Sequence, residues 1–135
     1  MNQIFNYFEG GIRMQLAQLM LYVENQKEIR DFWVKHFDFV VKNEVMNGDM
    51  YMIELSPHAN AETTIILHNR EQIMKMSPEI DMTTPSLLFA TSDLEKLHAR
   101  LVAANVTVGE IVDMPGYRVF NFADPENHYF AVKQA

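Results

Sequence analysis

An internal repeat constrains this chain more than any other feature of its sequence. When the sequence is shifted by 68 positions, residues 17–57 lie over residues 85–125 without a gap. Few residues are identical, but the spacing of the apolar positions recurs, and so do a glycine-containing turn and a proline near the end. Self-similarity at a fixed offset is typical of a duplicated supersecondary unit. The chain is therefore predicted to contain the same small unit twice.

A strand followed by a helix is predicted to open each unit. Side chains in residues 17–23 alternate between apolar and other types, which is the period of a strand with two unlike faces. Asn25 and Glu28 have the spacing of an N-terminal capping box, and apolar residues then recur at helical intervals. Ser92 and Glu95 have the same spacing in the second unit.

Three more strands complete each unit. They are expected at about 38–46, 49–56 and 63–68 in the first unit and at about 106–113, 117–123 and 128–134 in the second. Asn47-Gly48 is a strong two-residue hairpin signal, and Pro115-Gly116 marks the matching turn. The unit is therefore βαβββ, and the predicted fold class is α+β.

The repeat also divides the chain. We expect one domain overall, made of a first unit at 15–68, a linker at 69–84 and a second unit at 85–135. The polar linker has room for one helical turn before Pro78 stops it. Residues 1–14 join none of these patterns and form either a short N-terminal arm or an upstream extension, in which case Met14 is the natural start.

Composition and charge exclude several classes of protein. The chain has 135 residues and no cysteine, which rules out disulfides, a thiolate nucleophile and cysteine-based metal sites and fits a cytoplasmic location. With 18 acidic and 11 basic side chains the formal net charge is −7, which argues against nucleic acid as a partner. No run approaches the roughly 18 apolar residues of a membrane span. A small or cationic ligand suits this charge, although solubility alone also explains it.

A closing motif adds a family resemblance to the repeat. Residues 120–128 read FNFADPENH, and together with two βαβββ units over residues 15–134 this stretch resembles the vicinal oxygen chelate superfamily. That superfamily includes glyoxalase I, bleomycin-resistance proteins, fosfomycin-resistance enzymes and extradiol dioxygenases. The resemblance implies a cup-shaped, partly open, eight-stranded barrel-like sheet with the helices outside and ligand chemistry inside. Because the superfamily contains isomerases, transferases, dioxygenases and pure binders, the fold does not select the activity.

The metal site that the resemblance implies is missing from this sequence. Family enzymes carry His or Gln on the first strand of each unit and a carboxylate on the last strand. The corresponding positions here are Gln18, Ser86, Ala131 and the region of Ile66. One amide among these residues does not supply the three or more anionic or imidazole ligands that a divalent cation needs. We therefore expect no metal and no other cofactor.

Alternation along the strands selects the residues that would face a ligand. The predicted ligand contacts lie on the strand faces turned away from the helices: Gln18, Met20, Met52, Glu54, His68, Ser86 and Phe120. Either face of the strand at 117–123 can point inward, and the repeat assigns Phe120 to the cup. The methionines and Phe120 form either a soft apolar pocket or ordinary core.

Glu54 and His68 are the best candidates for catalysis. They are the only plausible acid/base pair on cup-facing positions of neighbouring strands. A pocket lined by Met and Phe raises the pKa of a carboxyl group, and a nearby imidazole carries a proton. The competing interpretation is that both side chains, which lie near strand ends, are simply solvated.

The leading interpretation of function is a metal-independent protein that binds and sequesters a small molecule. It resembles the bleomycin-resistance proteins, which hold a cationic drug in grooves formed by a dimer, and the same resemblance implies a homodimer here. The alternative is a glyoxalase-like lyase or isomerase, or a dioxygenase, with an atypical site around Gln18, Glu54 and His68. The sequence leaves open whether any reaction is catalysed.

Overall fold

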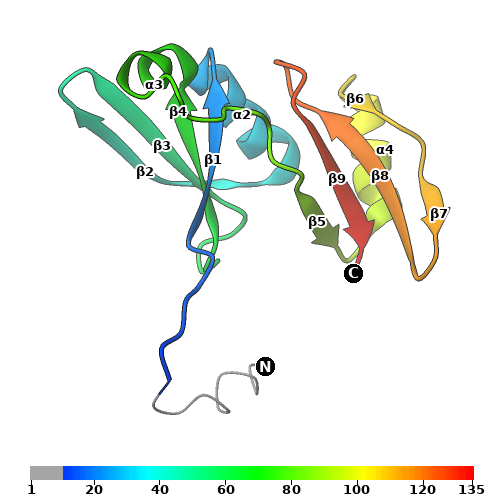
Figure 1. The fold of residues 1–135 in the computed structure, drawn as a ribbon. Helices are drawn as coiled ribbons and strands as arrows, with labels where there is room; N and C mark the ends of the chain where they lie inside the picture. The colour runs from blue at the N-terminus through cyan, green and yellow to red at the C-terminus, as the bar shows by residue number, and fades with distance from the viewer. Residues whose placement is uncertain (1–10) are drawn as a thin grey trace.

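The computed structural model describes residues 11–135, so most of the expected N-terminal arm lies outside the described part of the chain. Within it, two β-sheets stand side by side (Figure 1). The first sheet has the order β1-β4-β3-β2, with β1 at Gln18–Val23, β2 at Val40–Asn47, β3 at Met50–Ser56 and β4 at Thr64–Asn69. The second has the order β5-β9-β8-β6, with β5 at Leu88–Thr91, β6 at Thr107–Val108, β8 at Tyr117–Ala123 and β9 at Tyr129–Gln134. Strand β7 at Val112–Met114 pairs with β8.

The strand pairing repeats from one sheet to the other. β1 runs parallel to β4, and β5 runs parallel to β9. Both units are therefore βαβββ, but the single strand predicted at 106–113 is broken into β6 and β7. The break begins at Gly109, whose N–H donates to the Asn121 carbonyl of β8 at 2.8 Å, so the chain stays attached to β8 while the regular ladder stops. The two sheets do not close into one barrel, contrary to the barrel-like sheet expected from the resemblance.

Capping side chains set where the helices begin. Helix α2 spans Gln26–Phe37, and the Asn25 side chain accepts the Glu28 N–H at 3.1 Å, which is one half of the predicted capping box. The other half is replaced, because the Asn25 N–H donates to the Glu126 carboxylate at 2.8 Å. The expected helical turn in the linker is helix α3 at Arg70–Met76, which ends before Pro78.

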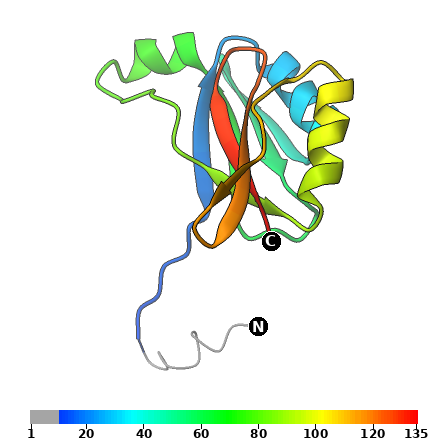
Figure 2. The ribbon, with the colours of Figure 1, turned by 90° about the vertical axis from the view of Figure 1, so that its right-hand side faces the viewer.

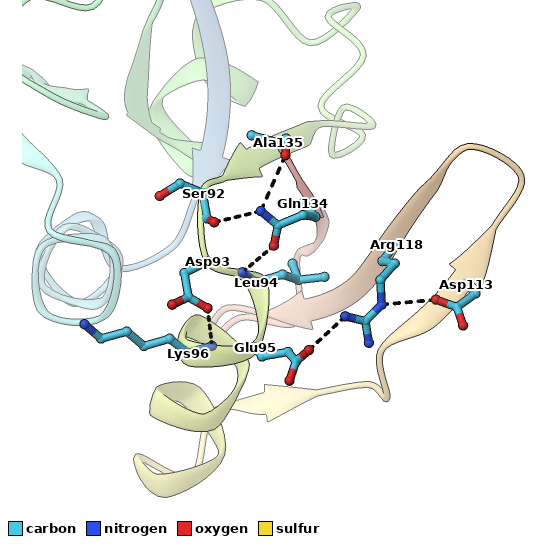
Figure 3. A network of polar contacts seen from close by, with 9 residues as sticks. All are labelled: Ser92, Asp93, Leu94, Glu95, Lys96, Asp113, Arg118, Gln134 and Ala135. Carbon is cyan, nitrogen blue, oxygen red and sulfur yellow. Dashed lines mark hydrogen bonds and ion pairs between the residues drawn. The ribbon is translucent and has the colours of Figure 1, made fainter.

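The second predicted cap is displaced by one residue. Helix α4 spans Leu94–Ala103, and Asp93, not Ser92, accepts the Lys96 N–H at 3.1 Å. Ser92 is held differently, because its carbonyl accepts from Gln134 Nε2 at 2.7 Å while Gln134 Oε1 accepts the Leu94 N–H at 2.9 Å (Figure 3). The end of β9 thereby fixes the start of α4.

One hydrophobic core joins the two units. Trp33 of α2 is fully buried, and its ring centroid lies 5.6 Å from Phe89 and 5.3 Å from Phe130, both in the second sheet. The same helix packs on the first sheet, where Gln26 Nε2 donates to the carbonyls of Tyr51 and Leu67 at 2.6 and 2.9 Å. Helices α2 and α4 therefore cover one side of the sheets (Figure 2). The opposite side, called here the open face, is left without them.

The predicted faces are confirmed for five strands and wrong for β8. Leu21, Ile53, Leu67, Phe89 and Val132 turn toward the helices as expected. On β8 the repeat assigned Phe120 to the cup, but Phe120 is 1% exposed and its ring lies 4.9 Å from that of His98 on α4. Phe120 therefore belongs to the core under α4 and is excluded from the open face.

The error has an identifiable cause in the hairpins. In the first unit Asn47 pairs with Met50, so Gly48 is the first of the two turn residues. In the second unit Met114 pairs with Tyr117, so Gly116 is the second of the two turn residues. Superposing the two glycines therefore shifts the strand by one position. Because side chains alternate along a strand, that slip exchanges its two faces.

The closing motif at residues 120–128 forms the turn between β8 and β9. Asp124 is 4% exposed. Its carboxylate accepts the N–H groups of Glu126 and His128 at 2.9 and 3.0 Å and lies 2.7 Å from His128 Nδ1. Asn127 occupies the left-handed region with φ of 63°, which Asn tolerates better than most residues. These contacts fold the turn between β8 and β9.

Candidate functional site

A fixed carboxylate lies on the open face of the first sheet. Glu54 of β3 accepts through Oε2 from Thr64 Oγ1 at 2.7 Å and from Gln18 Nε2 at 3.3 Å. Strand register explains the grouping, because Gln18 lies opposite Thr64, and Glu54 lies opposite Ile66, which is two residues further along β4 and therefore on the same face. The structure therefore brings together two of the predicted ligand contacts, Gln18 and Glu54, and adds Thr64, which the sequence reasoning did not single out.

An imidazole and two methionines lie on the same face. His68 Nε2 is 3.2 Å from Met20 Sδ, and the His68 ring stacks on Tyr22 with centroids 5.7 Å apart. Met52 lies opposite His68 on β3. His68 Nδ1 is buried and has no hydrogen-bond partner among the described residues. Burial lowers the pKa of His68, so its imidazole is neutral at pH 7.

The predicted acid/base pair is not joined in this structure. Glu54 is hydrogen-bonded to Thr64 and Gln18, whereas His68 contacts Met20. No hydrogen bond connects Glu54 with His68 within residues 11–135. The two groups share a face, but they belong to separate contacts.

The open face of the second sheet is mainly apolar and aromatic. Leu88 is 52% exposed and Tyr129 is 58% exposed. Lys133 Nζ lies 5.7 Å from the centroid of the Tyr117 ring, a distance at which the cation interacts with the aromatic face. Ser86 precedes β5 and is exposed, so it lies beside this face without belonging to a paired strand.

The residues present do not fit the divalent metal of the family enzymes. Ala131 pairs with Leu88, and Ile66 pairs with Met20, so aliphatic side chains stand at both expected carboxylate positions. Among residues 11–135 no group of three or more His, Cys, Asp or Glu side chains is placed to hold an ion. Gln18 and Glu54 supply two oxygen ligands, fewer than such a site requires.

Sequence reasoning missed a cavity on the helix side. It has a volume of about 470 Å³ and is lined by residues of α2 and α4, including Trp33 and Leu97. The helical spacing of these apolar residues identified them as core, and spacing within one helix does not reveal a gap between two helices. None of the helices in the described range has the length and apolar composition of a membrane span.

Solved structures share this fold at low sequence identity. The antibiotic binding protein TnmS3 from Streptomyces sp. CB03234 is 21% identical with a TM-score of 0.75, covering 90% of this chain and 96% of that one. A superfamily member from Sphaerobacter thermophilus DSM 20745 is 22% identical with a TM-score of 0.72, covering 91% and 98%. The fosfomycin resistance protein FosX from Listeria monocytogenes is 14% identical with a TM-score of 0.68, covering 92% and 95%.

Structural similarity at this level of identity shows the fold alone, and the family is established by a match to a family model. No curated protein matches the sequence. The model described as Glyoxalase/Bleomycin resistance protein/Dioxygenase superfamily matches residues 15–132, which include both βαβββ units from β1 into β9. The chain belongs to the glyoxalase/bleomycin resistance protein/dioxygenase superfamily.

Proposed function

We propose that this protein binds a small cationic organic molecule on the open face of its first sheet, without a metal, and sequesters it. The observation that carries the proposal is the Glu54 carboxylate, which Thr64 and Gln18 hold in one position. Apolar side chains lie next to it on the same face, because Ile66 is opposite Glu54 and Met20 is opposite Ile66. A fixed polar group within an apolar surface is the usual composition of a small-molecule site.

The charge of the proposed ligand follows from Glu54 and from the whole chain. A carboxylate attracts a cation directly, and the net charge of −7 favours the approach of cations over anions. Similarity to TnmS3, an antibiotic binding protein, supports a role in holding a drug-like molecule. A cytoplasmic location stays a prediction that rests on the absence of cysteine.

A second copy of the chain is the proposed cover of the site. Large apolar side chains on the open face are exposed in one copy, including Met20 at 37%, Leu88 at 52% and Tyr129 at 58%. Both sheets present such side chains on the same side of the molecule, where a partner's open face would bury them. A homodimer would thus turn a shallow face into a groove.

The enzyme alternative rests on a separate observation. Burial lowers the pKa of His68, and its Nε2 lies against the Met20 Sδ, so a neutral imidazole on the open face is available as a general base. In this alternative the protein is a glyoxalase-like lyase or isomerase, or a dioxygenase, with Gln18, Glu54 and His68 around the substrate. Chemical change of a bound compound during incubation, lost in His68→Phe, would favour it over sequestration.

Calorimetric titration with a matched pair of compounds tests the binding proposal. The cation 9-aminoacridine is expected to bind, and neutral acridine to bind more weakly. Glu54→Gln keeps the size of the side chain and removes its charge, so affinity for the cation should fall by about tenfold or more, the value of a hydrogen bond to a charged group. Gln18→Leu should weaken binding by a smaller factor.

Glu79→Gln is the control for Glu54→Gln, because Glu79 is exposed in the linker and belongs to no strand of the first sheet. It should leave the affinity unchanged. Equal affinity of wild type and Glu54→Gln for 9-aminoacridine would contradict the proposed site, and failure of both compounds to bind would contradict the ligand class.

Metal independence has its own test. Because Ala131 and Ile66 provide no ligand atoms, dialysis against EDTA should leave the melting temperature unchanged, whereas removing a tightly bound ion lowers it. Differential scanning calorimetry before and after dialysis measures this. A stoichiometric transition metal that survives dialysis would overturn the claim and favour the enzyme alternative.

A further inference from the structure

A set of soft ligand atoms lies on the open face of the first sheet, apart from the contacts of Glu54. The chain has no cysteine, so its ten methionines are its only sulfur-containing residues. Two of them, Met20 of β1 and Met52 of β3, lie on either side of His68, which belongs to β4 between those strands. Thioether sulfur is a soft ligand that selects Cu(I), whereas carboxylate oxygen selects Mg²⁺ and Ca²⁺. This set therefore differs in kind from the divalent site of the family enzymes.

The contact between His68 and Met20 has the spacing of two ligands of one ion. His68 Nε2 lies 3.2 Å from Met20 Sδ. Two atoms that each bind the same ion at about 2.0–2.3 Å lie about 3–4 Å from one another. Met20 is 37% exposed, so an ion can reach its sulfur atom from solvent.

Strand register supplies a third ligand. Met52 is the partner of His68 across the ladder between β3 and β4. Side chains directly opposite each other point to the same face, with Cβ atoms about 4.5–5.5 Å apart. The three rotatable bonds of methionine let the sulfur of Met52 approach the imidazole while the backbone stays in place. Three neighbouring strands thus provide one ligand atom each.

The imidazole of His68 is held in the form that binds a metal. Burial lowers its pKa, which favours the neutral ring, and a neutral ring has a free lone pair on one nitrogen. The ring stacks on Tyr22 with centroids 5.7 Å apart, which restricts its plane. Nδ1 is buried without a hydrogen-bond partner in residues 11–135, so Nε2, which lies against Met20, is the nitrogen available to an ion.

From these observations we infer that Met20, Met52 and His68 form a site for a soft monovalent metal ion, with Cu(I) as the ion that fits it. One imidazole nitrogen and two thioether sulfurs carry no charge, so they leave the charge of the ion uncompensated. That favours a monovalent over a divalent ion, because an unpaired charge is costly to remove from water. None of the four positions at which the family enzymes bind their divalent metal takes part.

The EDTA experiment described above is unaffected by this site. Dioxygen oxidises Cu(I) to Cu(II), which prefers nitrogen and oxygen ligands in a tetragonal arrangement that two thioethers do not supply. Protein purified in air is therefore expected to be free of copper and to bind the ion only under reducing conditions.

Titration of the full chain with Cu(I) tests the site. Protein with ¹³C-labelled methionine methyl groups is titrated under nitrogen with ascorbate as reductant. We expect one equivalent of Cu(I) to move the methyl resonances of Met20 and Met52 and to leave that of Met46 in place. Met46 is 67% exposed and pairs with Tyr51, which packs against the core on the other face of the same sheet. Ag(I), which air does not oxidise, should act as Cu(I) does, and Zn²⁺ should move neither resonance.

Leucine variants test the two sulfur ligands one at a time, because leucine replaces methionine at nearly constant volume. Loss of a group that merely orients a ligand lowers metal affinity by about 10–100-fold, so Met20→Leu and Met52→Leu should each lower the Cu(I) affinity by about tenfold or more. His68→Phe should do the same. Met46→Leu is the matched control and should leave the affinity unchanged. Competition with a colorimetric Cu(I) chelator measures these affinities, and circular dichroism checks that each variant is folded.

This inference does not rest on the proposed organic ligand. Glu54 contacts Thr64 and Gln18 and supplies no ligand to the ion, so Glu54→Gln should leave the Cu(I) affinity unchanged. Unmoved Met20 and Met52 resonances after one equivalent of Cu(I) would overturn the inference. So would full Cu(I) affinity in Met20→Leu and Met52→Leu, or movement of the same resonances by Zn²⁺.

Discussion

At the residue scale, two half-buried histidines respond to their surroundings in opposite directions. A hydrogen bond to the Asp124 carboxylate raises the pKa of His128, and desolvation only partly opposes this effect. His68 has no such carboxylate partner, and burial lowers its pKa. The surroundings of His128 thus favour its charged form, and those of His68 favour its neutral form. The type of residue is the same, and the neighbouring groups decide the direction in which its pKa moves.

His128 should make stability depend on pH. Its pKa is higher in the folded than in the unfolded state, so its contribution is fully present below about pH 6.5 and is lost as pH rises through the raised value. The loss of unfolding free energy in His128→Asn should therefore be larger at pH 5.5 than at pH 9, by about 1 kcal/mol. Urea titrations of both proteins at the two pH values measure this. The other histidines are present in both proteins, so their titration does not change the difference in unfolding free energy between them. If that difference were the same at pH 5.5 and pH 9, the ion pair between His128 and Asp124 would be contradicted.

At the scale of elements, a loop of the second unit caps a helix of the first. The two carboxylate oxygens of Glu126 accept the N–H groups of Glu24 and Asn25, each at 2.8 Å. These N–H groups precede α2, where the partial positive charge of the helix favours an anion. The closing motif therefore fixes both its own turn and the position of α2, the helix that packs on both sheets.

Removal of this cap should destabilise the whole fold. Glu126→Ala removes the carboxylate from two exposed N–H groups, which water then solvates, and is expected to cost about 0.5–2 kcal/mol of unfolding free energy, as the loss of a helix cap does. Glu126→Gln retains one acceptor oxygen and should lose less. Urea denaturation of both variants measures the effect, with Glu79→Ala as the exposed control. If Glu126→Ala unfolded at the same urea concentration as the control, the cap would have no energetic role.

At the scale of the whole molecule, both sheets leave an apolar face on the side away from α2 and α4. Leu88 on this face and Val102 on the outer side of α4 are each 52% exposed in a single copy. Equal exposure makes them a matched pair for testing which side of the molecule meets a partner.

Sedimentation should show a dimer that dissociates when the open face is charged. Leu88→Asp is expected to yield a folded monomer, because a carboxylate in the proposed interface must be desolvated without a partner. Val102→Asp should remain dimeric. Analytical ultracentrifugation with circular dichroism separates dissociation from unfolding. A monomeric wild type at all concentrations, or dissociation caused equally by both variants, would count against a dimer through the open face.

The sequence by itself determined the repeat, the βαβββ order and the faces of most strands, because capping and alternation act over a few neighbouring residues. Gln18, Met20, Met52, Glu54 and His68 were placed on the open face for that reason. Alternation did not decide the face of β8, where both sides carry apolar residues, and only packing against α4 placed Phe120 in the core. The tertiary structure alone decided the contacts of Glu54 and His68 and the cavity between α2 and α4. Each depends on distances between elements far apart in the chain, which no local pattern encodes.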